Sequence, residues 1–281
     1  MTEAVVRVSI VLPVRNGARY LAESVRSVEA QSLRDWELIA VDDGSTDATP
    51  EILATLAAQD GRIRVVRNDP ALCLPGALNR GFEAAQGSLL TWTSDDNVFR
   101  PEALASMVAT LEQRHEADVV YADYTLIDGD GRELERRSVP QIEHLGYSNV
   151  VGPCFLFRRH VWQALGGYAD DLFLAEDYDF WLRAVARFRF LRLASDLYLY
   201  RTHPGALGTS RRYEVGLATA RALERSLPLL PRRMRFAAMT RLEDLAMEAG
   251  QAAKAHSWRR RALFTAPLLS ARRIISRLRS S

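Results

Sequence analysis

Short apolar runs rich in β-branched residues alternate with segments of helical periodicity through the first half of the chain. The apolar runs predict strands at residues 7–14, 36–44, 63–69, 88–94 and 118–128. Apolar residues at helical spacing predict helices at residues 18–31, 76–86 and 101–114, and one that starts near Thr49-Pro50. Repeated strand–helix units predict an α/β fold with a Rossmann-like, mainly parallel sheet flanked by helices on both faces.

The alternation weakens after about residue 140, although residues 188–201 form another apolar run. From residue 206 the pattern is that of helices rich in alanine, leucine and arginine. A chain of 281 residues is long enough for one large domain with an appendage. We therefore expect an α/β domain over residues 1–204 and a basic, helical C-terminal extension over residues 205–281.

The charge of the chain divides at the same point. The net charge is +2, but residues 205–281 contain 16 basic and 5 acidic residues, whereas residues 1–204 contain 21 basic and 30 acidic residues. An acidic body with a basic extension indicates either two separate roles or work beside an anionic surface. Aromatic residues are sparse between the basic ones, which argues against a nucleic-acid partner.

The last residues suggest what such a surface could be. In residues 267–281 a narrow helical stripe of Leu268, Ala271, Ile275 and Leu278 lies beside several arginines. Two interpretations fit equally: an interfacial helix on anionic lipid, and a packed helix with a solvated arginine face. The first would place the protein peripherally at the inner face of the cell membrane.

The two cysteines, Cys73 and Cys154, provide neither a disulfide framework nor the ligand spacing of a zinc site. No segment is long and apolar enough to span a bilayer, and the short apolar run at the N-terminus has no basic region before it. These features predict a reducing compartment, and the cytoplasm is the expected location.

Polar clusters follow three of the predicted strands at the point where each strand ends. They are Pro13-Val14-Arg15-Asn16, Asp42-Asp43-Gly44-Ser45 and Asp95-Asp96-Asn97. The carboxyl ends of parallel strands meet at one edge of a sheet, and ligands bind there. The three clusters therefore predict one shared ligand site.

Each acidic cluster allows a structural and a functional interpretation. Asp42-Asp43 suits a strand-ending turn, and it also suits a ligand N–H group such as that of a uracil base. Adjacent carboxylates at Asp95 and Asp96 repel each other unless a cation compensates, and oxygen ligands suit Mg²⁺ or Mn²⁺. Asp96 or Asn97 could instead cap the helix that follows.

Two further candidates lie in the second half of the chain. Glu176-Asp177 precedes apolar residues at helical spacing. These acids either favour the start of a helix through its dipole or include a general base that faces the ligand site. His203, which precedes a proline, suits either a loop position or a ligand role.

Together these elements resemble family 2 of the glycosyltransferases, inverting enzymes with the GT-A fold. The resemblance covers roughly residues 7–204, and five ordered stretches carry it. They read VSIVLPVRNGARYLAESVRSV, ELIAVDDGSTDATPEIL, LCLPGALNRGFEAAQGSLLTWTSDDN, GGYADDLFLAEDYDFWLRA and YRTHPG. The resemblance implies transfer of a sugar from a nucleotide-diphospho-sugar, most simply a UDP-sugar, to a hydroxyl group. The acceptor would be a saccharide or a lipid-linked molecule in surface polysaccharide or glycolipid biosynthesis.

The resemblance also implies roles for particular residues. Asp177 would be the catalytic base, and Asp95 would bind a divalent metal, Mg²⁺ or Mn²⁺, with His203 as a further metal or diphosphate ligand. Asp43 would read the base of the nucleotide, with support from Asp42. The other implied substrate-binding positions are Pro13, Val14, Asn16, Asn79, Ser94, Asp96, Glu176 and Arg201.

One position departs from the family pattern. The family usually has Asp-x-Asp where this chain has Thr93-Ser94-Asp95, so one strong metal ligand remains instead of two. Metal affinity without the donor is therefore expected to be weak. The same departure keeps open a catalytically impaired nucleotide-sugar-binding protein. A sugar nucleotidyltransferase or a dinucleotide-dependent oxidoreductase would need a glycine-rich loop after the first strand, and residues 13–20 contain one glycine.

Overall fold

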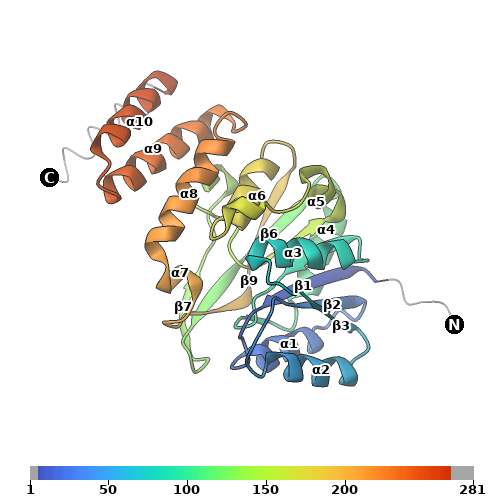
Figure 1. Cartoon of the computed structure of the whole chain (residues 1–281). Helices are drawn as coiled ribbons and strands as arrows, with labels where there is room; N and C mark the ends of the chain where they lie inside the picture. Colours follow the sequence, from blue (N-terminus) through green and yellow to red (C-terminus); the bar gives the residue numbers. More distant parts are fainter. Residues whose placement is uncertain (1–5, 267–281) are drawn as a thin grey trace.

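Nine strands form one sheet within residues 6–266, the part of the chain that the computed structural model describes (Figure 1). The strand order is β3-β2-β1-β4-β8-β6-β9-β5, and β7 pairs with β6. The parallel half of the sheet consists of β1 Val8–Val14, β2 Trp36–Asp42, β3 Ile63–Arg67 and β4 Leu89–Trp92. The other strands are β5 Val98–Phe99, β6 Val119–Ile127, β7 Glu133–Arg137, β8 Phe155–Arg158 and β9 Phe190–Arg201. The predicted α/β fold with a Rossmann-like sheet is confirmed.

Strand β8 separates β4 from β6, so the sheet is not purely parallel. Phe157 pairs with Leu90 on one side and with Val119 on the other, in both cases antiparallel. The sequence pattern did not predict β5, β7 or β8. Strands of two to five residues are too short to show a period, and all five residues of β7 are exposed and mostly charged.

Helices cover both faces of the sheet because successive side chains of the buried strands point to opposite sides. Ile10 and Leu12 of β1 belong to the hydrophobic cluster under one set of helices, and Val11 belongs to the cluster on the other face. The first set is α1 Leu21–Glu29, α2 Thr49–Gln59 and α4 Ala103–Gln113. The second set is α3 Cys73–Ala84, α5 Arg159–Leu165 and α6 Glu176–Ala184.

The predicted C-terminal helices are present within the described residues, and they join the core of the sheet domain. They are α7 Leu207–Ser210, α8 Arg212–Ser226, α9 Arg232–Glu248 and α10 Ala252–Thr265. Helix α8 packs beside α6, and α9 packs on the short 3-10 helix Ile142–Gly146 (Figure 1). Leu223 and Leu242 are buried in the same cluster as Val11. The α8 and α9 helices therefore extend the second face of the sheet.

Two sequence predictions concern membranes. Among the described residues, no helix is both long enough and apolar enough to cross a bilayer. The apolar and arginine stripe predicted for residues 267–281 lies outside the described residues.

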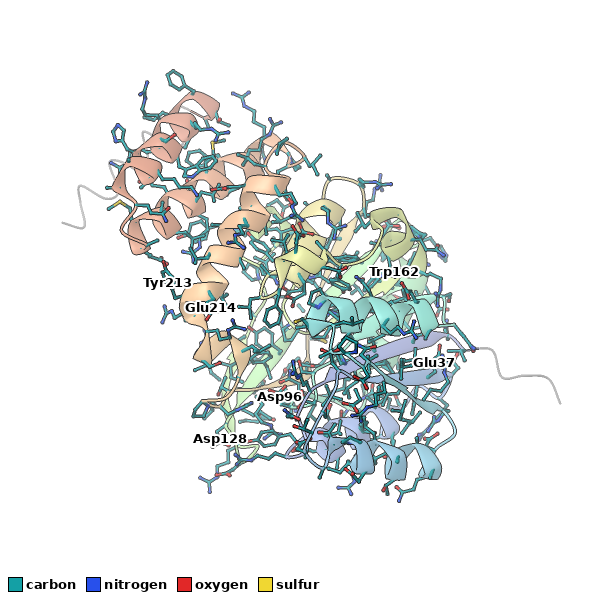
Figure 2. All side chains as sticks on the ribbon, in the orientation of Figure 1. Glu37, Asp96, Asp128, Trp162, Tyr213 and Glu214 are labelled. Carbon is teal, nitrogen blue, oxygen red and sulfur yellow. The ribbon has the colours of Figure 1, made fainter. Side chains whose placement is uncertain are left out.

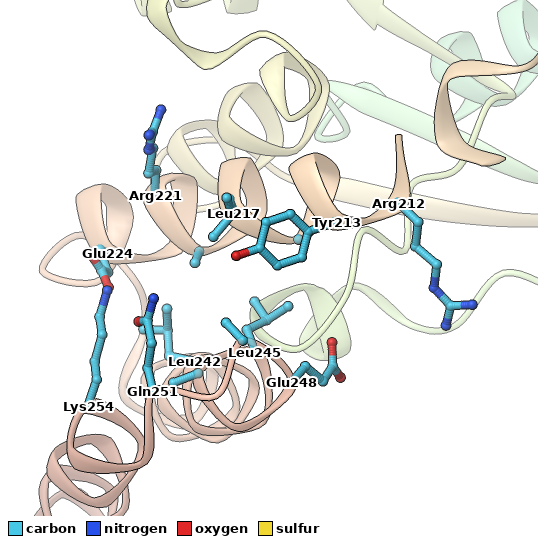
Figure 3. A pocket seen from close by; sticks show the side chains of 14 residues that line it. Arg212, Tyr213, Leu217, Arg221, Glu224, Leu242, Leu245, Glu248, Gln251 and Lys254 are labelled. Carbon is cyan, nitrogen blue, oxygen red and sulfur yellow. The ribbon is translucent and has the colours of Figure 1, made fainter. Parts of the chain in front are cut away.

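A cavity of about 440 Å³ lies between α8, α9 and the start of α10 (Figure 3). Leu217, Leu242 and Leu245 are among the residues that line it, and an ion pair of 2.8 Å between Lys254 and Glu224 borders it. Helix α8 therefore lines this cavity with one side and packs beside α6 with another.

Helix α3 approaches the sheet closely because it has a glycine at the contact. A Cβ atom at Gly81 would lie 2.4 Å from Cγ1 of Val11 and 3.1 Å from Cγ2 of Val41, and both valines are buried. We predict that Gly81→Ala lowers the free energy of unfolding by about 1–3 kcal/mol, because this overpacking outweighs the higher helix propensity of alanine. Urea denaturation measures the change. The control is Gly61→Ala, whose Cβ has open space; equal stability of the two variants would contradict the prediction.

Candidate active site

A cleft of about 1330 Å³ opens at the carboxyl ends of β1, β2 and β4, where the polar clusters were expected to meet. Asp96, labelled in Figure 2, lies in its wall between the sheet and the C-terminal helices. The wall contains ten of the predicted site residues: Pro13, Val14, Asn16, Asp43, Ser94, Asp95, Asp96, Glu176, Asp177 and His203. The structure therefore gathers most of the candidates, while Asp42, Asn79 and Arg201 are not part of the wall.

The loops after β1 and β2 hold each other through short hydrogen bonds. The backbone N–H of Asn16 donates to Oγ of Ser45 at 3.0 Å, and Oδ1 of Asn16 accepts from the N–H of Thr46 at 2.8 Å. The N–H of Gly17 donates to Oγ1 of Thr49 at 3.0 Å, so the Thr49 hydroxyl fixes the neighbouring loop. These bonds give the floor of the cleft a defined shape.

Asp43 and Asp42 differ in their positions relative to the cleft. Oδ1 of Asp43 accepts hydrogen bonds from Nδ2 of Asn68 at 2.9 Å and from the N–H of Leu72 at 2.7 Å. Among the described residues none donates to Oδ2 of Asp43, so that oxygen is available to a ligand N–H. Asp42 is buried behind the cleft, where it accepts from the N–H of Ser45 at 2.9 Å and pairs with Arg67 at 2.8 Å. Asp42 thus supports the turn that presents Asp43.

Asp95 is held tightly in the wall. A Cβ atom at position 17 would lie 2.0 Å from Oδ2 of Asp95, so only glycine fits there. Burial, and then the neighbouring charge of Asp96, raise the pKa of Asp95 to about 7. No basic side chain among the described residues forms an ion pair with it. A carboxyl group in this position favours a cation.

No group of three or more acidic, histidine or cysteine side chains that could hold a metal occurs in the described part of the chain. The residues nevertheless fit the predicted ion in part, because Asp95 lacks a cationic partner and Asp96 lies next to it. Nε2 of His203 lies 3.1 Å from Oδ2 of Asp96, and both line the cleft. The protein therefore offers an incomplete ligand set that substrate oxygens would have to complete.

Arg201 lies beneath the cleft as a buried connector, with 1% of its side chain exposed. Its Nε donates to the carbonyl of Asp96 at 2.8 Å, and its Nη1 donates to the carbonyls of Asp128 and Gly129 at 3.2 and 3.3 Å. Its Nη2 pairs with Glu23 at 2.7 Å. Four of its five N–H groups donate to the protein. In this structure Arg201 therefore positions the loop of Asp96 from outside the cleft wall.

Asn79 is likewise placed away from the cleft wall. Its Oδ1 accepts from the N–H of Tyr168 at 2.8 Å, and its Nδ2 donates to the carbonyl of Tyr168 at 2.9 Å and to Asp170 at 3.2 Å. Both ends of the amide are engaged. Asn79, one of the implied substrate-binding positions, therefore links α3 to the segment before α6 in this structure.

Thr93 occupies the position of the first aspartate of the family's Asp-x-Asp pattern. Its hydroxyl lies 2.6 Å from the hydroxyl of Tyr198, and the side chain is buried outside the cleft wall. An aspartate at this position would bury a charge beside a phenol. Thr93 thus makes a neutral contact behind the cleft, and the acids that line the cleft include Asp95 and Asp96.

Glu176 and Asp177 begin helix α6 and face the cleft together. Burial, and then the charge of Asp177, raise the pKa of Glu176 to about 8. Burial also raises the pKa of Asp177, against the hydrogen bonds from the N–H of Tyr178 at 2.6 Å and from Nδ2 of Asn149 at 2.8 Å. A carboxylate with a raised pKa accepts a proton more readily than a free one.

The sequence analysis missed several residues that line the cleft or orient its acids. Asn149, which orients Asp177, lies in an irregular stretch before Gly152-Pro153. The C-terminal helices contribute Arg211, Val215, Thr219 and Arg241 to the wall. The first three, which lie directly before α8 and on it, recur at intervals of four residues, and this helical spacing is the signal that could have found them.

Backbone conformation marks the same cleft. Three residues other than glycine have a positive φ in the described part of the chain: Asn16 at 56°, Cys73 at 62° and Leu174 at 74°. All three line the cleft. Such conformations cost free energy and persist where the surrounding structure enforces them, which is typical of ligand sites.

The α/β sheet, with an acidic cleft at the carboxyl ends of its strands, has the GT-A fold. The model of the family "Glycosyl transferase family 2" matches residues 9–166, and the chain belongs to this family. The expected family is therefore confirmed.

Relatives and solved structures agree with this assignment. Protein y4gI of Sinorhizobium fredii is 32% identical over 231 residues, which are 78% of this chain and 25% of that protein. The uncharacterized glycosyltransferase RP339 of Rickettsia prowazekii is 32% identical over 200 residues, which are 67% of this chain and 59% of that protein. The chain thus spans between a quarter and three fifths of these relatives.

Two solved structures show the same fold. Staphylococcus aureus TarS 1–349 in complex with UDP-GlcNAc has a TM-score of 0.66 at 17% identity, and the match covers 90% of each chain. The mannosyltransferase PcManGT of Pyrobaculum calidifontis, in complex with GDP-Man and Mn²⁺, has a TM-score of 0.68 at 17% identity. That match covers 96% of this chain and 80% of the other.

We predict that Arg201→Met lowers the free energy of unfolding by about 3 kcal/mol or more, because it leaves buried carbonyl groups without a donor. Thermal and urea denaturation measure the loss. Arg137→Met is the matched control, since Arg137 forms an exposed pair with Glu135 and should change stability by less than about 0.5 kcal/mol. A stability of Arg201→Met equal to that of the control would show that the buried guanidinium does not hold the loop.

Asp95 predicts a pH-dependent stability. Its pKa is raised from 3.8 in the unfolded chain to about 7 in the fold, so the protonated form favours folding and this advantage is lost as the pH rises toward 7. Asp95→Asn should therefore raise the melting temperature at pH 8, in the presence of a chelator, by more than it does at pH 5. Calorimetry at both pH values measures the difference. Equal gains, or a gain confined to pH 5, would contradict the raised pKa.

Proposed function

We propose that this chain is an inverting glycosyltransferase that transfers a sugar from a nucleotide-diphospho-sugar, most simply a UDP-sugar, to a hydroxyl group of an acceptor. The observation that carries the proposal is that one cleft contains both Asp43, with an oxygen available to a base N–H, and Asp177, oriented by Asn149. The complexes of TarS with UDP-GlcNAc and of PcManGT with GDP-Man support a nucleotide-sugar donor for this fold.

The chemistry requires a single base and no covalent intermediate. The carboxylate of Asp177 accepts the proton of the acceptor hydroxyl while its oxygen attacks the anomeric carbon. The bond from that carbon to the diphosphate oxygen breaks on the opposite side, so the nucleoside diphosphate leaves and the configuration inverts (compare inverting hydrolysis). Each oxygen of Asp177 already accepts one hydrogen bond, and a second lone pair on each remains for the acceptor.

A divalent cation, Mg²⁺ or Mn²⁺, belongs to this proposal, and the Mn²⁺ in the PcManGT complex supports it. Asp95 would hold the ion, and the neighbouring Asp96–His203 pair lies within the same wall. When bound, the ion would neutralise the charge that develops on the leaving diphosphate. Because the protein ligand set is incomplete, we expect weak metal affinity until the donor supplies its oxygens.

The biological setting is proposed on coarser grounds. A relative in Mycobacterium tuberculosis, 28% identical over 184 residues and covering 63% of this chain and 69% of that protein, is named as a PGL/p-HBAD biosynthesis glycosyltransferase. That name supports a saccharide or lipid-linked acceptor in surface polysaccharide or glycolipid biosynthesis. A cytoplasmic protein with peripheral contact to the inner face of the membrane, through the basic C-terminal extension, fits the charge distribution of the sequence.

The proposal predicts that Asp177→Asn keeps donor binding and loses transfer. Thermal-shift measurements with UDP- and GDP-sugars, each with Mn²⁺ or Mg²⁺, identify the donor, because a ligand at 100 times its Kd adds about 2.7 kcal/mol of stability. With that donor, turnover of Asp177→Asn should fall by about 10²–10⁴-fold, whereas Asp130→Asn, in an exposed turn, should behave as wild type. Wild-type turnover by Asp177→Asn would reject this base, and no response to any nucleotide sugar would reject the function.

A further inference from the structure

Two arginines from the C-terminal helices line the same cleft as the proposed base. Arg211 lies directly before α8, and Arg241 lies in the middle of α9. Neither belongs to the segment that the family model matches, which ends at residue 166. The cleft therefore contains two arginines that have no role in the proposed donor site.

Each of these arginines lies over an aromatic ring close to the base. The guanidinium carbon of Arg211 is 5.4 Å from the ring centre of Phe173, in the segment that leads into Glu176. The guanidinium carbon of Arg241 is 5.8 Å from the ring centre of Tyr147, two residues before Asn149. A guanidinium group that stacks on a ring keeps its N–H edges available for an anion.

The present partners of the two arginines are replaceable. Arg211 pairs with Glu214, and Arg241 pairs with Glu248 at 3.3 Å, and both glutamates are exposed. Exposed pairs of this kind contribute little stability, so a ligand anion can compete for the arginines. Asp244 accepts a hydrogen bond from the Tyr147 hydroxyl at 3.1 Å and thereby anchors the ring.

From this arrangement we infer that Arg211 and Arg241 form the acceptor subsite, and that the acceptor is a saccharide carrying a phosphate or diphosphate group. The inference rests on the proposed function, which places the reacting hydroxyl at Asp177. Guanidinium groups bind phosphate oxygens in a bidentate manner and so fix orientation as well as charge. The phosphate then anchors the acceptor at the C-terminal wall while its hydroxyl group reaches the base.

Equilibrium binding to the full chain tests the inference, with UDP (or the nucleotide diphosphate found to bind) and Mn²⁺ at saturation to block the donor site. The probes are glucose 1-phosphate and N-acetylglucosamine 1-phosphate, the methyl glycosides of both sugars, and N-acetylglucosamine joined through a diphosphate to a phenoxyundecyl chain. We expect the phosphorylated sugars to bind at least about tenfold more tightly than the methyl glycosides. Tighter binding of the phenoxyundecyl-linked sugar than of the sugar phosphates would identify a lipid-linked source of the phosphate, and the reverse order a free sugar phosphate.

Variants assign the preference to the two side chains. Arg211→Gln combined with Arg241→Gln should abolish the preference for phosphate, while the corresponding lysine variant, which keeps both charges, should retain part of it. The control is Arg221→Gln, which removes one positive charge from α8 at the separate cavity of Figure 3 and should leave the preference for phosphate unchanged.

Two results would overturn the inference. One is equal affinity of the wild-type protein for methyl glycosides and sugar phosphates. The other is a loss of nucleotide affinity in the double glutamine variant, because the arginines would then serve the donor diphosphate. Failure of the wild-type protein to bind any nucleotide is a different result, which counts against the proposed function; the phosphate preference is then measured on the nucleotide-free protein.

Discussion

Five carboxylic acids line the cleft, and three of them combine a raised pKa with the absence of an ion pair to any basic side chain in the described part of the chain: Asp95, Glu176 and Asp177. Burial is the main cause of the raised pKa of all three, and the charge of a neighbouring acid adds to it at Asp95, beside Asp96, and at Glu176, beside Asp177. Only neutral donors, such as Asn149, stabilise the charged forms. A cation at Asp95 and a proton from an acceptor at Asp177 are the two changes that relieve this situation, and both belong to the chemistry proposed for the site.

Several other residues around the cleft hold these acids and their loops in place. Gly17 is required because the Asp95 carboxylate occupies the space of a Cβ atom, and the positive φ of Asn16 lets the same loop bond to the loop after β2. Arg201 supplies the opposite support, since it binds the carbonyl of Asp96 from below and joins it to Glu23. The charge of Arg201 is thus used for architecture, and it leaves the acids in the cleft uncompensated.

The difference between what the sequence predicted and what it did not has a physical basis. Strands β1, β2 and β4 and their acidic ends were predictable, because buried parallel strands are continuously apolar and the polar residues after them stand out. The roles of Asn79 and Arg201 were not, since a motif gives the type of a residue but not the direction of its side chain. Asn149 and the short strand β8 depend on tertiary contacts alone, and neither has a period or a turn signal that marks it.

The C-terminal helices illustrate the same limit at a larger scale. Composition predicted their helices and their charge, but a charge count does not show whether arginines face solvent, lipid or a cleft. Packing on the core decides this: Leu223 and Leu242 fix α8 and α9 against the sheet domain, and the stripe from Arg211 to Thr219 then faces the proposed base. The segment matched by the family model ends at residue 166, so Asp177 and the two cleft arginines of the C-terminal helices lie beyond it. If the proposed function holds, the part of the acceptor that lies away from the reacting hydroxyl group is expected to contact the C-terminal helices, because they form the remaining wall of the cleft.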